Sequence, residues 1–222
     1  MKKATEIVLI ILILSLVAGC NVMSVAKTTT DESEYISQEG RFADDGKLFL
    51  LPVAVLTDKG FEEENERGDH NMLDAGLVAS AMSAFPENTV IPVTRAMIAN
   101  VKNGWGNFSD LVTNLDKPEE FNSMTNKKML QSVIDIIQKK TNIDAGHVLL
   151  VTVNGDKSNF ANSSNIRGQT SIINLNEASL RQATTMEHEY LAAASTEASY
   201  VPAVTLLIKE SLDKVKIKAE KP

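Results

Sequence analysis

The sequence has a single cysteine, Cys20, among its 222 residues. One thiol excludes a disulfide within the chain, so the fold is expected to depend on a packed core instead of cross-links. An odd cysteine calls for an explanation, and the position of Cys20 near the amino terminus supplies one. Six prolines and eleven glycines are too few for a disordered or collagen-like chain, which leaves an ordinary globular protein.

The signatures of the common catalytic sites are absent. The sequence contains no Gly-x-Ser-x-Gly nucleophile elbow, no phosphate-binding loop and no complete dinucleotide-binding fingerprint. Its histidines are His70, His147 and His188, and no second histidine follows His188 at the spacing of a zinc-protease helix. We therefore predict no catalytic residue, no metal site and no cofactor. His188 is interpreted as a surface histidine among carboxylates, and His70 beside Asp69 as a solvated pair at a helix start.

The chain has fewer basic than acidic residues. The chain has 22 lysines and arginines against 29 aspartates and glutamates, which gives a formal net charge of −7. A negative surface repels phosphate backbones, so nucleic acid is not an expected partner. The same sign gives no attraction to anionic lipid, so attachment to a membrane would need another device.

The amino terminus has the layout of a signal peptide. Two lysines follow Met1, residues 7–17 are apolar apart from one serine, and small residues precede Cys20. The apolar run is too short to span a bilayer comfortably as a helix. We expect residues 1–19 to be a signal peptide that is cleaved between Gly19 and Cys20.

Residues 17–20, Val-Ala-Gly-Cys, resemble the lipobox of bacterial lipoproteins. The resemblance implies that the Cys20 thiol receives a diacylglyceryl group and that the new amino group is acylated too. Two or three acyl chains anchor a protein stably in a lipid bilayer. Asn21 stands where Asp would retain an enterobacterial lipoprotein in the inner membrane, so the resemblance implies an outer-membrane anchor with the domain in the periplasm. An uncleaved anchor, or secretion with a free thiol, is the alternative.

The rest of the chain divides into a polar segment and a folded domain. Residues 20–46 are polar and without periodicity, which predicts a lipidated terminus and a flexible tether. Apolar patterning begins at Lys47. Residues 47–222 are therefore expected to form one periplasmic α/β domain, a mixed β-sheet covered by amphipathic helices.

The predicted strands are short apolar runs, and the predicted helices have apolar residues three and four positions apart. Strands are expected at 47–56 with Pro52 at an edge or bulge, 89–93, 147–153, 166–174 and 179–191, the last of which is alternatively helical. Helices are expected at 71–85 with Asn71 as N-cap, at 95–101 capped by Thr94, from Thr125 or Asn126 to 140, and at 202–215. Residues 57–70 and 103–107 are expected to be loops.

Trp105 is the single tryptophan, and it lies between two glycines in the predicted loop 103–107. A tryptophan in a loop can be a binding anchor at the mouth of a pocket. An aromatic cover over the core is the interpretation that we favour, and the binding role stays the alternative.

The order of elements resembles periplasmic lipoproteins whose fold is like the amino-terminal domain of the translocation protein TolB. That group includes the curli secretion lipoprotein and activator lipoproteins of penicillin-binding proteins. The resemblance covers residues 47–215 and rests on the strand 47–56 with its Leu-Pro-Val end, the helix 71–85, the strand 90–93 followed by Thr94-Arg95, the strand 147–153 and residues 166–175. It implies a non-enzymatic docking or assembly domain of an envelope machine.

Three functions follow from these observations. We predict first an interaction or assembly module of the cell envelope, anchored in the bilayer by acylated Cys20 and bound to an envelope protein. The second is binding of an envelope polymer or a small molecule, with Trp105 at a pocket mouth. The third is a hydrolase whose site is built from dispersed carboxylates and His188.

Overall fold

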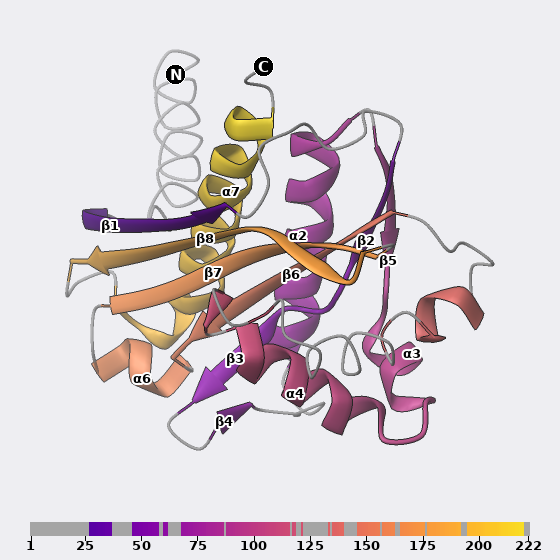
Figure 1. The fold of residues 1–222 in the computed structure, drawn as a ribbon. Coiled ribbons are helices and arrows are strands. Elements are labelled where there is room, and N and C mark those ends of the chain that lie inside the picture. Colours follow the sequence, from indigo (N-terminus) through magenta and orange to yellow (C-terminus); the bar gives the residue numbers. More distant parts are fainter. Residues whose placement is uncertain are drawn as a thin grey trace, which may run out of the picture.

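The chain folds around an open mixed β-sheet with helices on both faces (Figure 1). This is a computed structural model, and it describes residues 27–36, 46–57, 60–61, 68–86, 88–115, 117–118, 121, 133, 135–139, 146–155, 157–162, 165–175, 177–191 and 195–219. The strands lie in the order β1-β8-β7-β6-β2-β5, with β3 beside β6 and β4 beside β3. The predicted fold class, a mixed sheet covered by helices, is confirmed.

The strands are β1 (Lys27–Ile36), β2 (Lys47–Leu50), β3 (Ala54–Thr57), β4 (Gly60–Phe61), β5 (Thr89–Pro92), β6 (His147–Asn154), β7 (Asn165–Asn174) and β8 (Ser179–Tyr190). The helices are α2 (Gly68–Ala84), α3 (Arg95–Ala99), α4 (Gly104–Leu115), α6 (Lys157–Asn162), the 3₁₀ helix η2 (Glu197–Ser199) and α7 (Tyr200–Ala219). Strand β2 is parallel to β5 and to β6, whereas β7, β8 and β1 continue the sheet in antiparallel order. The carboxyl ends of β2 and β5 therefore lie side by side.

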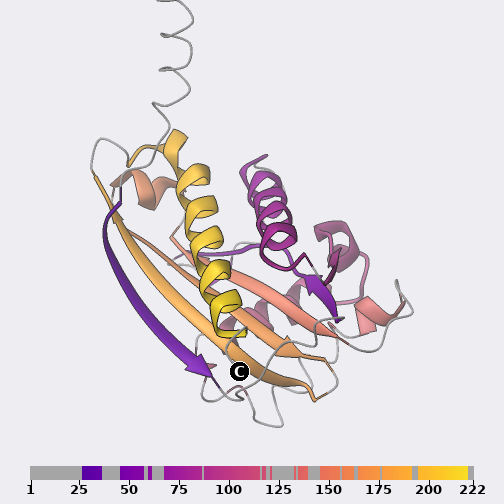
Figure 2. The same ribbon diagram turned by 90° about the horizontal axis from the view of Figure 1, so that it is seen from above.

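Two cores form because side chains alternate along the central strand β6. Leu149 and Val151 pack with α2 and α7 on one face, and Val148 and Leu150 pack with α3 and α4 on the other. Figure 2 shows α2 and α7 next to each other on the same face. Burial on both faces explains the continuous apolar run from which the sequence predicts a central strand, and this prediction is confirmed.

Strand β1 lies within the segment predicted to be a tether. Its residues pair with β8 from Lys27 opposite Tyr190 to Ile36 opposite Gln182. The pairing is made by the backbone, and an edge strand of polar residues has no apolar alternation from which a strand is predicted. The described fold therefore includes residues 27–36. Gly19, Cys20, the whole predicted signal peptide and tether residues 20–26 and 37–45 lie outside the described residues.

The predicted strand 47–56 is interrupted at Pro52, which separates β2 from β3. The strand predicted at 179–191 is confirmed by β8, which pairs with β7 from Ser179 to Glu189, so the helical alternative is wrong. The helix predicted from Thr125 or Asn126 lies mostly outside the described residues, although 133 and 135–139 are helical with Val133 buried.

Helix predictions are confirmed for 71–85, where α2 begins at Gly68 instead of Asn71, and for 95–101, where α3 is shorter and ends at Ala99. The predicted cap of α3 is confirmed, because Thr94 Oγ1 accepts from the Met97 backbone N–H at 3.3 Å. The loop predicted at 103–107 is wrong, because α4 begins at Gly104. A Cβ on Gly104 would overlap the carbonyl of Ile98, so this glycine permits the close approach of α4 to α3. The turn itself is made by Asn103, whose φ is 56°.

Candidate functional site

An apolar cavity of about 350 Å³ lies where β2 and β5 end. It is lined by the residues that follow the two strands, by α2 and by the start of α3: Leu50, Leu51, Pro52, Asn71, Asp74, Ala75, Leu77, Val78, Pro92, Val93, Thr94, Arg95 and Ala96. The carboxyl ends of adjacent parallel strands are the usual place for a ligand in an open α/β sheet. The volume is within the range of small-molecule pockets.

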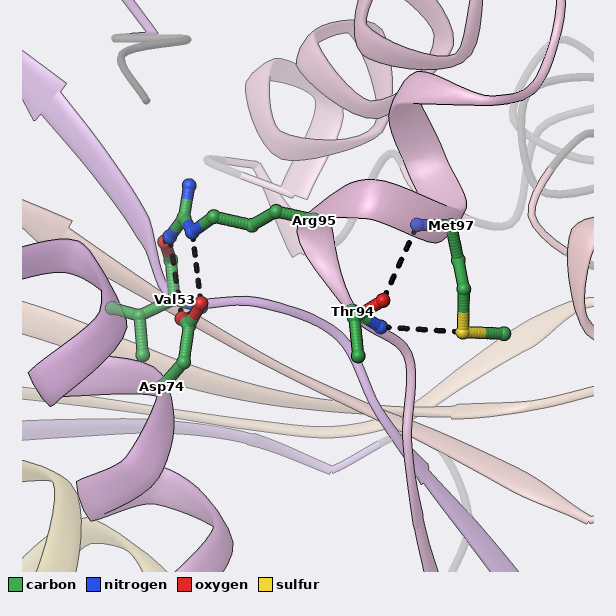
Figure 3. A network of polar contacts seen from close by, with 5 residues as sticks. All are labelled: Val53, Asp74, Thr94, Arg95 and Met97. Atoms are coloured by element: carbon green, nitrogen blue, oxygen red, sulfur yellow. Dashed lines mark hydrogen bonds and ion pairs between the residues drawn. The ribbon is translucent and has the colours of Figure 1, made fainter. Parts of the chain in front are cut away.

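The main polar feature of the cavity wall is an ion pair between Asp74 of α2 and Arg95 of α3 (Figure 3). Arg95 Nε donates to Asp74 Oδ2 at 2.8 Å and Arg95 Nη2 donates to Asp74 Oδ1 at 3.2 Å, a two-pronged contact. Only 9% of the Arg95 side chain is exposed. The pair is thus fixed in one geometry, with the guanidinium largely removed from water and the carboxylate still 25% exposed.

The same two side chains satisfy the backbone of Val53. The Val53 N–H donates to Asp74 Oδ1 at 2.8 Å, and the Val53 carbonyl accepts from Arg95 Nη2 at 2.7 Å. Pro52 interrupts the strand at this point, so the ion pair supplies partners that the interrupted ladder does not. The Asp74 carboxylate therefore has a structural role, because together with Arg95 it satisfies the backbone at the junction between β2 and β3.

The sequence does not predict this pair, because Asp74 and Arg95 are far apart in the chain and belong to no motif. The available signal was Pro52 within an apolar run, which indicates an interruption whose backbone groups need partners. Nothing in the run shows which side chains provide them.

Trp105 lies in the first turn of α4 and is partly buried against the core formed with α3 and α4. Its ring meets the Phe108 ring edge-on at 5.7 Å, and Arg95 Cζ lies 5.9 Å from its centroid. Trp105 is not among the residues that line the cavity. These contacts favour the interpretation as an aromatic cover over the core, with Arg95 between the indole and the cavity.

His188 is completely buried, so its interpretation as a surface histidine is wrong. Alternation along β8 points it toward α7, where its Nε2 lies 3.3 Å from Glu210 Oε2. Its Nδ1 lies 3.1 Å from the Tyr190 hydroxyl, which donates to the Ala203 carbonyl at 3.2 Å. Since His188 lies beneath α7 and not in the cavity, a hydrolase site built on it has no geometric support.

The other two histidines are also buried. His70 was predicted to be solvated, and this is wrong because its side chain is buried. The neighbouring Asp69 is partly exposed and pairs with Lys157 at 3.2 Å. His147 begins β6, and its Nε2 lies 3.4 Å from Arg181 Nη1. Burial first, and then the charge of Arg181, lower the pKa of His147 to about 4, against a smaller opposing effect of Glu177. An arginine can only donate, so Nε2 accepts, as expected of a neutral imidazole.

Helix α2 exposes an apolar surface beside the cavity. Met72, Ala75, Ala79 and Met82 lie on its outer side, and the two methionine side chains are 58% and 60% exposed. We call these four residues the α2 apolar face. The neighbouring helix α7 exposes charged residues instead, including Lys209. Exposed Met82 opposite the buried residues of α2 shows that this helix is apolar on both sides, which leaves the helical periodicity of its sequence ambiguous.

Within the described ranges, no three residues of the types His, Cys, Asp and Glu are grouped as metal ligands would be. The helices described are all too short or too polar to cross a bilayer.

Comparison with known proteins finds no matching family model and no matching curated protein. Among solved structures, the chain is similar to the PelC dodecamer from Paraburkholderia phytofirmans, with 8% identity, a TM-score of 0.44, and coverage of 87% of this chain and 100% of the other. It is similar to protein XCC0632 from Xanthomonas campestris, of family DUF330, with 10% identity, a TM-score of 0.39, and coverage of 88% and 95%. Because these TM-scores are below 0.5, the likenesses establish neither a family nor a function.

Proposed function

We propose that the protein is a lipid-anchored, non-enzymatic interaction module of the bacterial envelope, and that its protein partner binds the α2 apolar face. The anchor is Cys20, acylated in the outer membrane, with the domain in the periplasm. The α2 apolar face is the observation that carries the proposal, because a contiguous apolar surface on a soluble domain usually marks a binding site.

The charge distribution favours a partner with an uncharged apolar surface. The exposed residues of α2 are Asn71, Met72, Ala75, Ala79, Met82 and Ser83, and none of them is charged. The chain as a whole has a net charge of −7. A neutral face is therefore the part of an acidic surface that is least costly to desolvate when a partner covers it.

The cavity continues this surface inward. Ala75 belongs both to the α2 apolar face and to the cavity wall, and the neighbouring Val78 also lines the cavity. A partner lying on α2 has a pocket of about 350 Å³ into which one apolar side chain can insert. Anchoring by one inserted side chain, with apolar contacts around it, is the usual arrangement of a strong interface centre.

Site-specific photocrosslinking in intact cells tests the proposal. A benzoylphenylalanine in place of Met82 is expected to form one discrete protein adduct, and the same residue in place of Lys209 on α7 is expected to form none. Met72→Glu, which puts a charge on the same face, is expected to remove the Met82 adduct without unfolding the domain. Identical adducts from both positions, or none from position 82, would contradict the proposed interface.

The second candidate is binding of a small molecule or an envelope polymer segment in the cavity. The observation that favours it is the cavity itself, at the carboxyl ends of β2 and β5. It ranks second because the side chains of Asp74 and Arg95 already bind each other and the Val53 backbone. Trp105 lies close to Arg95, so its fluorescence should change when cell-wall fragments fill the cavity. A spectrum unmoved by saturating fragments argues against this candidate.

A further inference from the structure

We infer that the end of the sheet where β1 begins contacts the lipid bilayer, with Leu191 as its apolar contact. The inference rests on the proposed lipidation of Cys20 and goes beyond it, because it fixes which part of the domain faces the membrane. The occupant of this surface is the lipid of the membrane that holds the anchor.

The first argument is the length of chain between the anchor and the fold. Strand β1 begins at Lys27, seven positions after Cys20. Seven residues span at most about 25 Å when fully extended, since a residue contributes no more than about 3.6 Å. A domain that began at Lys47 would have a much longer tether. With β1 in the sheet, the amino end of this strand cannot move far from the bilayer surface.

The second argument is what lies beside that end. Lys27 pairs with Tyr190, the last residue of β8, and Leu191 follows immediately. Leu191 is 51% exposed, and it is the one large exposed apolar residue outside α2 among the described residues. An exposed leucine at the point of the fold nearest to a lipid anchor gains free energy by entering the interfacial region of the bilayer.

The third argument is the direction of the strands. The β7–β8 turn, with exposed Glu177, lies at the opposite end of β8 from Leu191. Strand β8 has 12 residues, which corresponds to about 40 Å at about 3.3 Å per residue. Figure 1 shows β1 and β8 running together along this edge of the sheet. If one end of β8 contacts lipid, a sheet standing on that end keeps Glu177 away from it.

The test uses the full-length lipidated protein in phospholipid vesicles. The only native thiol is expected to be blocked by lipid, so Leu191→Cys and Glu177→Cys can each be labelled with a single environment-sensitive fluorophore. The label at position 191 is expected to be blue-shifted and quenched by lipid-attached nitroxides, and the label at position 177 is expected to be unaffected.

Equal quenching at the two positions, or stronger quenching at position 177, would overturn the inferred orientation. Mass spectrometry of the same preparations separates this result from a failure of the proposed function. An unmodified Cys20 would refute the anchor itself, whereas an acylated and vesicle-bound protein with position 191 in water would refute only the contact of Leu191 with lipid.

Discussion

The Asp74 side chain connects α2 to α3 and to the junction between β2 and β3. Asp74→Asn is expected to lower the free energy of unfolding by about 3–5 kcal/mol, because Arg95 then stays buried without a counter-charge. The measurement is urea unfolding of the purified domain. Asp69→Asn is the matched control on the same helix: its pair with Lys157 is partly exposed, so the loss should be under about 1 kcal/mol. Equal losses in the two variants would contradict the structural role of Asp74.

His147 makes the stability depend on pH. Burial and then the charge of Arg181 lower its pKa from the ordinary 6.5 to about 4 in the folded chain. Above pH 6.5 both states are neutral, and as the pH falls from 6.5 to 4 only the unfolded state binds the proton, so stability decreases over this window. The full effect is on the order of 3 kcal/mol.

His147→Gln removes this proton uptake, so its free energy of unfolding should fall less than that of the wild type as the pH is lowered over that window. Arg181→Gln should flatten the profile partly, because the charge of Arg181 is the second cause of the lowered pKa. Parallel profiles for all three proteins would show that His147 does not titrate in this way.

At the scale of elements, the packing of α7 on the sheet depends on a missing side chain in β7. Gly168 is buried beneath α7, and a Cβ there would overlap Leu207 Cδ2. Close by, the Thr170 and Ser211 hydroxyls are hydrogen-bonded across the same interface. Gly168→Ala is expected to cost about 1–3 kcal/mol of folding free energy, since α7 must shift or Leu207 must leave its position.

A double-mutant cycle measured by urea unfolding tests whether Leu207 is the obstacle. Leu207→Ala alone should cost about 2–5 kcal/mol because it leaves a cavity. The combination with Gly168→Ala should cost less than the sum, because the new methyl group then occupies vacated space. If the losses of the two single variants simply add in the double variant, Leu207 is not the obstacle to a side chain at position 168.

Elements were predictable where burial leaves a pattern in the sequence. Strand β6 is covered on both faces and reads as an unbroken apolar run, and α3 begins at a capping threonine. Strand β1 leaves no such pattern, because it is a mostly polar strand at the edge of the sheet that pairs with β8 through its backbone. The ion pair between Asp74 and Arg95 and the burial of His188 both require segments that are distant in the sequence to meet in the fold. Local periodicity does not contain that information. The α2 apolar face was not predicted, because apolar residues on the exposed side of a helix give the same sequence pattern as a second buried side.

At the scale of the whole molecule, the anchor and the fold are separable. Cys20 precedes β1, and the described sheet needs no residue before Lys27. Cys20→Ala is therefore expected to abolish lipid labelling and mature processing. In a domain produced without the signal peptide, the same substitution should leave the free energy of unfolding unchanged. A Cys20→Ala domain exported with a signal peptide that is cleaved without lipidation should be soluble at low as well as high salt, because an acidic domain is not attracted to anionic lipid.

Membrane fractionation with metabolic lipid labelling measures this outcome, and Asn21→Asp is the matched control because it leaves the cysteine intact. In a species that follows the enterobacterial sorting rule, Asn21→Asp should stay lipidated and move from the outer to the inner membrane. If the Cys20→Ala domain, freed of its signal peptide, still pelleted with membranes at high salt, attachment would have to come from the protein surface. The contact at Leu191 would then be sufficient by itself, and the short connection from Cys20 to β1 would not be what orients the domain.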